Sequence, residues 1–168
     1  MTKTSHRVWK YGDKVNTDVI FPGKYTYTIS QDPAALARHA LEDLDPSFAA
    51  NARPGDVILA GRNWGNGSSR EQAVTCLLAA GVHAVIAASF ARIYYRNAIN
   101  SGLLVIECPP VVESVETGDL IEIDLETTQI YHAGQTYEFP PLPQQVLDIL
   151  DAGGIIPYLQ ANSIRDGE

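Results

Sequence analysis

The middle of the chain alternates between short apolar runs and longer segments with helical spacing. Three runs rich in Val, Ile, Leu and Ala have the length of buried strands: residues 56–61, 83–89 and 103–107. Two segments between them have the length of helices: residues 68–80 and 90–100. Gly81 and Gly102 follow these two segments as helix-ending residues. This order predicts a parallel sheet with right-handed crossovers, which places the chain in the α/β class.

The segments around this middle part add a second kind of structure. Residues 120–125 alternate between apolar and polar side chains, and short runs at 129–131 and 136–139 are separated by a tight turn, so these three runs predict antiparallel strands. Other expected features are helices at residues 33–44 and 144–150, a polar loop at 11–18 and a soft joint at 107–110. We expect residues 1–168 to form one layered α/β domain with a parallel core and a β-rich edge.

Composition and charge limit what the chain can bind. It has 168 residues, of which 45% are hydrophobic and 19% are charged, as in an ordinary folded domain. The net charge of −8 argues against non-specific attraction to nucleic acid or to an anionic membrane. No apolar run has the roughly 18 residues that cross a bilayer, and the start lacks the apolar core of a signal peptide. We expect a cytoplasmic protein.

Cysteine and histidine usage argues against a metal centre within this chain. Cys76 and Cys108 are far apart and each lies in an apolar stretch, so neither a disulfide framework nor an iron–sulfur cluster is expected. The four histidines lack the spacing of a zinc site. Cys76 also falls on the apolar face of its predicted helix, which argues against a nucleophilic role. Any iron–sulfur cluster would have to come from another chain.

A glycine-rich turn at residues 61–71 (GRNWGNGSSRE) leads from a predicted strand into a predicted helix. It lacks the Lys of a Walker loop, and Arg70 stands where the dinucleotide fingerprint has its third glycine, so nucleotide binding is not expected. Gly65 and Gly67 let the backbone approach a ligand, and a helix start offers free N–H groups. Arg70 adds a planar charged fork that can hold a carboxylate through two hydrogen bonds. The turn therefore predicts a carboxylate site.

A purely structural interpretation also fits this turn. Ser68 and Glu71 have the spacing of a capping box, in which their side chains would only satisfy the first amide groups of the helix. If Ser68 is instead a reacting group, Ser69 or water would have to share the capping. The sequence does not decide which serine caps.

Polar residues elsewhere also allow a structural and a functional interpretation. In the stretch at residues 13–25, Asp18 fits either an ordinary turn or a place beside an active-site cation. Lys24 fits either a solvated position or a place near a substrate carboxylate. Asn97 and Asn100, in the second predicted helix, could line a cleft or hydrogen-bond loop backbone.

Three stretches carry a resemblance to a known family: residues 16–25 (NTDVIFPGKY), 61–72 (GRNWGNGSSREQ) and 89–103 (SFARIYYRNAINSGL). In this order they are similar to the swivelling domain of aconitases in its free-standing form, the small subunit of isopropylmalate dehydratase and of homoaconitase. The resemblance is close over residues 7–108 and loose over the remainder. It implies a three-layer β/β/α swivelling fold.

The resemblance also implies a partner, a cofactor and a reaction. The chain would dock on a large subunit that carries a four-iron four-sulfur cluster, with the active site between the two subunits. The expected activity is that of a hydro-lyase acting on a hydroxy-carboxylic acid. The iron would take the departing hydroxyl as a Lewis acid, so this chain itself would hold no cofactor. The isolated subunit could self-associate.

Residue by residue, the resemblance implies roles at the matching positions. Ser68 would remove a proton from carbon, helped by the cationic Arg70. Ser69 and Arg70 would hold a substrate carboxylate and stabilise the developing charge. Asp18 completes the expected catalytic set with Ser68 and Arg70. The expected substrate-binding set is Ser69, Lys24, Tyr25, Thr26, Gly65, Asn66 and Gly67.

Two departures from the family pattern affect the expected chemistry. Gln72 stands where the family usually has His, so the role of that His is not carried over. The loop at residues 25–28 (YTYT) lacks the Arg expected for homoaconitate. This favours a substrate with an apolar branch, isopropylmalate, while homoaconitate, dimethylmalate, citraconate and maleate stay open. A carboxylate-binding or regulatory module without a catalytic partner also fits these residues.

Overall fold

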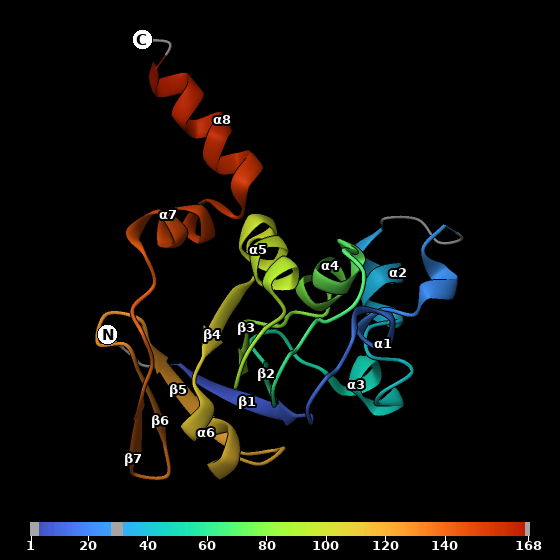
Figure 1. The fold of residues 1–168 in the computed structure, drawn as a ribbon, viewed down its shortest axis with the longest axis vertical. Helices are drawn as coiled ribbons and strands as arrows, with labels where there is room; N and C mark the ends of the chain where they lie inside the picture. Colours follow the sequence, from blue (N-terminus) through green and yellow to red (C-terminus); the bar gives the residue numbers. More distant parts are fainter. Residues whose placement is uncertain (1–3, 28–31, 167–168) are drawn as a thin grey trace.

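The computed structural model describes residues 4–27 and 32–166, and its strands form one mixed sheet (Figure 1). The strands are β1 (Ser5–Lys10), β2 (Val57–Ala60), β3 (Ala84–Ala87), β4 (Leu104–Glu107), β5 (Leu120–Asp124), β6 (Gln129–His132) and β7 (Gln135–Glu138). Their order across the sheet is β4-β3-β2-β1-β5-β6-β7. Strands β1 to β4 pair in parallel, whereas β5 to β7 add antiparallel pairs beyond β1. The expected parallel core with a β-rich edge is confirmed.

The parallel strands form where the chain has unbroken apolar runs. Every side chain of β2 and β3 is buried, and in β4 only Glu107 is exposed. Val57 pairs with Ala84, which pairs in turn with Leu104, so the three runs lie in register. A parallel sheet has both faces covered, and apolar runs without alternation suit such a position.

Helices connect and cover the strands (Figure 1). They are α1 (Thr17–Ile20), α2 (Pro33–Arg38), α3 (Pro46–Asn51), α4 (Gln72–Ala79), α5 (Arg92–Ser101), α6 (Pro109–Ser114), α7 (Gln144–Ala152) and α8 (Ile155–Asp166), with a 3₁₀ turn, η1 (Gly23–Tyr25), after α1. Gly102 ends α5 and Gly153 ends α7, each with a positive φ angle that suits a helix C-cap. None of the helices in the described residues is both long enough and apolar enough to cross a membrane.

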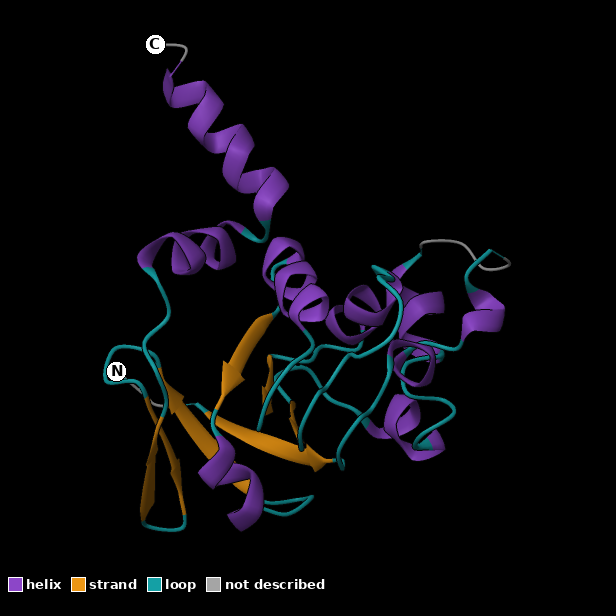
Figure 2. Ribbon diagram, viewed as in Figure 1, coloured by secondary structure: helices purple, strands orange, loops and turns teal. Residues whose placement is uncertain are grey.

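Two apolar clusters divide the molecule into three layers. On one face of the parallel strands, Ile58 and Val85 pack with residues from helices α1 to α5. On the other face, Leu59 and Ile86 pack with α6 and the antiparallel strands. Figure 2 shows the same division, with α4 and α5 above the parallel strands and α6 below them. The layers therefore follow the expected β/β/α order.

The start of α4 differs from the sequence expectation. The helix begins at Gln72 and not at residue 68. Gly65 and Gly67 have positive φ angles and so cannot be helical, and between them and the helix the side chains of Ser69 and Arg70 contact distant segments. Apolar spacing did not reveal the start because the buried face of the helix begins only at Ala73.

Other helices also differ from expectation. The helix expected at residues 33–44 ends at Arg38, and Leu41 beyond it has a positive φ angle of 56°. The soft joint expected at residues 107–110 is instead the end of β4 and the start of α6, where Pro109 suits the first helical position. Helix α8 was missed because the glycine pair after α7 indicates a stop, and a second helix begins directly after it.

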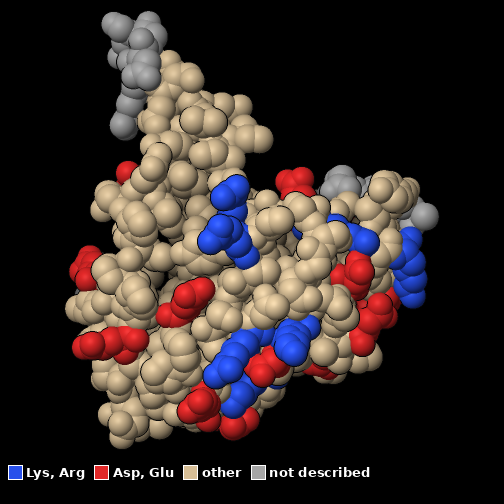
Figure 3. Space-filling view, viewed as in Figure 1, with Lys and Arg blue, Asp and Glu red and all other residues tan. Residues whose placement is uncertain are grey.

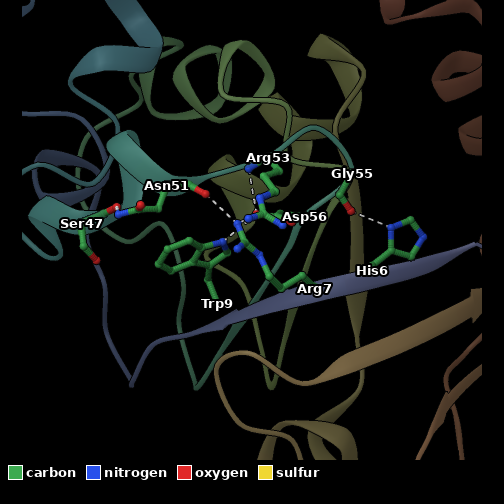
Figure 4. Close-up of polar contacts among 8 residues, drawn as sticks. All are labelled: His6, Arg7, Trp9, Ser47, Asn51, Arg53, Gly55 and Asp56. Carbon is green, nitrogen blue, oxygen red and sulfur yellow. Dashed lines mark hydrogen bonds and ion pairs between the residues drawn. The ribbon is translucent and has the colours of Figure 1, made fainter.

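A buried carboxylate joins the first strand to the loop before β2 (Figure 4). Asp56 Oδ2 accepts hydrogen bonds from two side chains of β1, Arg7 Nη2 at 2.7 Å and Trp9 Nε1 at 2.9 Å. It also accepts one from the Arg53 amide at 2.9 Å, and Arg7 Nη2 donates as well to the Asn51 carbonyl at 2.6 Å. Burial alone would raise the pKa of Asp56, but these hydrogen bonds outweigh burial and hold the pKa below its ordinary value.

We expect Asp56→Asn to lower the free energy of unfolding by about 2–3 kcal/mol at neutral pH, because Arg7 loses its charged partner. Since the folded-state pKa of Asp56 is lowered, its contribution is complete above the ordinary aspartate pKa of about 3.9 and is lost as the pH falls through the folded-state pKa. The difference between wild type and variant should therefore shrink below about pH 4. Urea unfolding at a series of pH values measures this difference.

Asp43→Asn is the matched control, because Asp43 is an exposed aspartate of the same region. It should change the free energy of unfolding by no more than about 0.5 kcal/mol. Equal losses in the two variants, or a loss at Asp56 that does not depend on pH, would show that the charge of Asp56 does not stabilise the fold.

Candidate functional site

Two loops that are far apart in the sequence pair along their backbones. They are residues 12–17, which follow β1, and residues 61–67, which follow β2. The Gly65 amide donates to the Val15 carbonyl at 2.8 Å, and the Thr17 amide donates to the Asn66 carbonyl at 2.9 Å. Further bonds join Lys14 to Arg62 and Gly61 to Gly12. This pairing fixes the glycine-rich turn against the start of α1.

Two glycines allow this close approach. Gly65 has a φ angle of 82° and is buried, and a Cβ atom there would overlap the ring of Tyr94. Gly67 has a φ angle of 106°, and a Cβ atom there would lie 3.2 Å from Thr17 Oγ1. Both positions therefore have a conformational reason for glycine that involves no ligand.

The guanidinium of Arg70 lies against the segment that contains α1 and η1. Arg70 Nη2 forms an ion pair with Asp18 Oδ1 at 2.7 Å, and Nη1 donates to Thr26 Oγ1 at 3.2 Å. Gly23 leaves space for the cation, because a Cβ atom there would lie 2.7 Å from Nη1. A guanidinium has five N–H donors, so these contacts leave donors for an anionic ligand.

An open pocket of about 400 Å³ lies beside this cation. Its walls are Gly23, Thr26, Tyr27, Ser68, Ser69, Arg70, Glu71 and Gln72. Asn97 on α5 donates from its Nδ2 atom to Ser69 Oγ at 3.2 Å. Within residues 4–27 and 32–166, the exposed Ser68 hydroxyl has no hydrogen-bond partner. An uncommitted hydroxyl and a cation therefore line the same open space.

The capping-box interpretation of this turn was wrong. Glu71 lies directly before the first turn of α4, and its side chain makes no capping hydrogen bond. The Ser69 hydroxyl instead contacts Asn97 on a different helix, and Ser68 lies four positions before the helix begins. Arg70 likewise precedes the helix and is not in its first turn. Contacts with distant segments, and not local capping, hold these residues.

Five of the expected substrate-binding residues lie outside the walls of the pocket: the two glycines Gly65 and Gly67, and three residues with side-chain contacts elsewhere. Lys24 is exposed, with its Nζ atom 4.0 Å from Glu42 Oε2. The ring of Tyr25 stacks on the ring of His39, with 3.9 Å between the centroids. The Asn66 amide group donates to a carbonyl of its own turn at 3.0 Å. Each of the three therefore has a contact outside the pocket.

The pocket also contains residues that were not expected. Gly23 was missed because its contact with Arg70 is long-range and leaves no local signal. Tyr27 is a fully exposed aromatic residue directly after Thr26, and an aromatic side chain in a polar loop was an available signal. Asp18 forms an ion pair with Arg70.

The residues of this chain do not fit an iron–sulfur cluster. Cys76 is buried in the cluster beneath the helices, and Cys108 is buried in the cluster on the opposite face of the sheet. Burial raises the pKa of both thiols, which disfavours the thiolate form that binds iron. Among the described residues, no group of three or more His, Cys, Asp or Glu side chains could hold a metal ion.

The chain is similar to known proteins over most of its length. The aconitase C-terminal domain family matches residues 14–111. The chain is 48% identical over 162 residues to the 3-isopropylmalate dehydratase small subunit of Nautilia profundicola. This match covers 94% of this chain and 95% of that protein. It is 47% identical over 157 residues to the isopropylmalate/citramalate isomerase small subunit of Methanocaldococcus jannaschii. This match covers 92% of this chain and 92% of that protein.

A solved structure extends the likeness to three dimensions. The crystal structure of 3-isopropylmalate dehydratase from Methanocaldococcus jannaschii superposes with a TM-score of 0.90 at 42% identity, covering 97% of this chain and 96% of that one. The family resemblance carried by the three sequence stretches is therefore confirmed. The chain belongs to the aconitase C-terminal domain family and, within it, to the 3-isopropylmalate dehydratase small subunits.

Proposed function

We propose that this chain is the small subunit of a hydro-lyase that interconverts 2-isopropylmalate and 3-isopropylmalate in leucine biosynthesis, together with a large subunit. One observation carries the proposal: the Arg70 guanidinium, held by Asp18 and Thr26, lines the same pocket as the uncommitted Ser68 hydroxyl. This pair of groups suits a substrate that bears carboxylates and loses a proton from carbon. The names of the relatives support the same reaction.

Arg70 binds a substrate carboxylate in this proposal. Its contacts with Asp18 and Thr26 fix the plane of the guanidinium before substrate arrives, so less side-chain entropy is lost on binding. A fixed plane with free N–H groups favours a carboxylate held through two parallel hydrogen bonds. Ser69, whose hydroxyl is oriented by Asn97, adds a donor at the same edge of the pocket. These residues orient the carbon that reacts.

Ser68 is the base that removes the proton from carbon. An ordinary serine hydroxyl is far too weak an acid to ionise, so it serves only where a cation stabilises its alkoxide. Arg70 lines the same pocket and supplies that charge. The Ser68 hydroxyl makes no hydrogen bond to the described residues, which leaves it available to the substrate. The Ser68 alkoxide takes the proton from one carbon while hydroxide leaves the adjacent carbon, which forms a double bond. The isomerisation is complete when Ser68 returns the proton to the carbon that lost hydroxide and the hydroxide adds to the other carbon.

The departing hydroxyl needs a Lewis acid that this chain does not provide. The cysteines of this chain do not fit an iron–sulfur cluster, so we assign the four-iron four-sulfur cluster to the large subunit. When bound there, the cluster supplies a metal ion that polarises the leaving hydroxyl. The small subunit contributes the proton transfer and the carboxylate site, and the active site is completed only in the assembled enzyme.

The pocket walls favour a substrate with an apolar branch. Among the described wall residues, Arg70 is the only cationic side chain, and Lys24 lies outside the pocket beside Glu42. Thr26 and Tyr27 provide methyl and ring surface where a longer acid would need a second cation. The remaining part of this loop, from residue 28, lies outside the described residues. Isopropylmalate therefore fits these walls better than homoaconitate, which has an additional carboxylate.

Citramalate, dimethylmalate, citraconate and maleate remain the closest alternative substrates, since they share the carboxylates and differ in the branch. Turnover of these acids and of homocitrate, measured side by side with isopropylmalate in the reconstituted enzyme, distinguishes them. A carboxylate-binding module without a catalytic partner is the alternative of a different class. A large-subunit gene with three cluster-binding cysteines beside this gene supports the enzyme, and its absence supports the module.

Four further expectations belong to the same proposal. The chain acts as one domain over residues 1–168, in the cytoplasm where the biosynthetic reaction takes place. It pairs with the large subunit, and the isolated small subunit can self-associate.

We expect Ser68→Ala to lower kcat of the reconstituted enzyme by about 10²–10⁴-fold, which is the usual contribution of a positioned general base. The fold and the association with the large subunit should be unchanged, because Ser68 is exposed and makes no hydrogen bond to the described residues. Steady-state kinetics at saturating large subunit measures kcat. The control is Ser114→Ala, an exposed serine of α6 on the opposite side of the sheet, which should retain full turnover. Wild-type turnover in Ser68→Ala would remove this residue from the mechanism.

Arg70→Lys should lower kcat/KM for isopropylmalate by about 10–100-fold, because a point charge replaces a fork that is held by two partners. If Arg70 already binds the carboxylate in the enzyme–substrate complex, most of the loss in kcat/KM should appear as a higher KM. The control is Arg62→Lys, an exposed arginine of the same turn that lies outside the pocket walls. Equal kcat/KM values for Arg70→Lys and the wild type would refute the carboxylate site.

A further inference from the structure

A continuous surface leads from the proposed active site to the C-terminal helix. The pocket beside Arg70 shares two wall residues, Ser69 and Glu71, with a second pocket of about 310 Å³. The second pocket extends over Asn97, Asn100, Ser101, Ile155 and Ile156. Ile156 in turn belongs to a third hollow along α8, formed with Leu159, Gln160 and Ser163. The three hollows therefore form one connected face, which we call the α5–α8 surface.

Apolar side chains are concentrated along this face. The described residues include seven large hydrophobic side chains that are exposed, and three of them, Tyr27, Ile156 and Leu159, line these hollows. Ile156 is 66% exposed and Leu159 is 53% exposed, both on α8. Ile93 is 53% exposed and shares a face of α5 with Asn97, four positions later, and Tyr27 lines the active-site pocket. Single exposed apolar residues are ordinary, but a connected group of them marks an interaction surface.

The first ten residues of helix α8, before Arg165 and Asp166, have the composition of a covered helix although α8 projects from the body of the molecule. Residues 155–164 include no charged residue, whereas a helix surrounded by water usually has a charged face. Figure 1 shows α8 extending beyond the other helices, and the part of this projection that Figure 3 does not draw in grey is tan, without red or blue side chains. Tyr158 packs against the core cluster near the start of the helix, which anchors α8 at one end. The outer face remains for a partner.

We propose that the α5–α8 surface is where the large, cluster-bearing subunit docks. This inference rests on the proposed function, because that function requires a partner over Ser68 and Arg70. The apolar face of α8 is continuous with their pocket, so a protein that covers one also covers the other. A second copy of this chain would close the pocket without supplying a Lewis acid. The large subunit alone fits both halves of the surface.

The surface also indicates the chemistry of the partner. The part formed by Ile156 and Leu159 accepts an uncharged apolar helix face or groove. The part formed by Asn97 and Asn100 offers side-chain amides, which pair with backbone or amide groups of the partner. Docking there would exclude water from the Ser68 pocket and strengthen the interaction between the serine oxygen and the guanidinium. Subunit association and activation of the base are thus one event.

The test compares two exposed leucines in the full-length chain. Leu159→Glu should weaken association with the large subunit by about tenfold or more, because a charge enters an apolar contact. Leu120→Glu is the matched control, since Leu120 is 59% exposed on β5, away from this face, and should bind as the wild type does. Association is measured by titrating the large subunit with each small subunit, and a high concentration of Leu159→Glu should restore turnover.

A second measurement does not depend on a destabilising change. Leu159→Cys introduces an accessible thiol, whereas Cys76 and Cys108 are buried, so a maleimide reagent reports on position 159. Saturating large subunit should slow this labelling at least about tenfold. Unchanged labelling together with wild-type association of Leu159→Glu would overturn the docking surface. Loss of self-association in Leu159→Glu, with unchanged large-subunit binding, would assign the face to a second copy and also overturn it.

Failure of the proposed function would give a different result from failure of the docking surface alone. If the wild-type chain shows neither binding to a large subunit nor turnover, the enzyme assignment falls and the docking surface falls with it. If the wild type binds and turns over isopropylmalate while Leu159→Glu behaves identically, only the docking surface falls.

Discussion

The backbone pairing between residues 12–17 and residues 61–67 determines where the polar groups of the proposed site lie. Each loop follows a strand of the parallel sheet, so the adjacency of β1 and β2 brings the two loops to one edge. The pairing then sets the start of α1 beside the turn, which places Asp18 against Arg70. Gly65 and Gly67 permit it, since both have positive φ angles that disfavour a side chain, and at Gly65 the ring of Tyr94 also fills the space. The position of the site is therefore a consequence of the strand order.

Much of the fold could be predicted because apolar runs report burial directly. Strands β2, β3 and β4 are buried on both faces, and the sequence shows this as unbroken Val, Ile, Leu and Ala. The start of α4 and the presence of α8 could not be predicted in this way. Residues 68–71 have helix-compatible composition but are held by long-range contacts, and α8 follows a glycine pair that does end the preceding helix. A local sequence pattern shows neither a contact with a distant segment nor a second helix that begins directly after a helix stop.

The family resemblance was the reason to group Thr26 with Arg70 and the two serines, which are distant from it in the sequence. In the structure all four residues line one pocket. Lys24 and Tyr25 are in the right segment but contact Glu42 and His39, which local sequence could not indicate. Of the expected residues, Thr26, Ser68, Ser69 and Arg70 line the pocket. Their catalytic roles are proposals that rest on this geometry and on the chemistry of each group.

The proposed reaction requires Ser68 and Arg70 to act together on a substrate between two subunits. The most direct measurement is the structure of the assembled enzyme with isopropylmalate or an unreactive analogue bound. We expect one carboxylate within hydrogen-bonding distance of both Arg70 Nη atoms or of one of them and Ser69, with the reacting carbon next to Ser68 Oγ. A ligand whose carboxylates are bound entirely by the large subunit, with Ser68 remote from the carbon, would contradict the account.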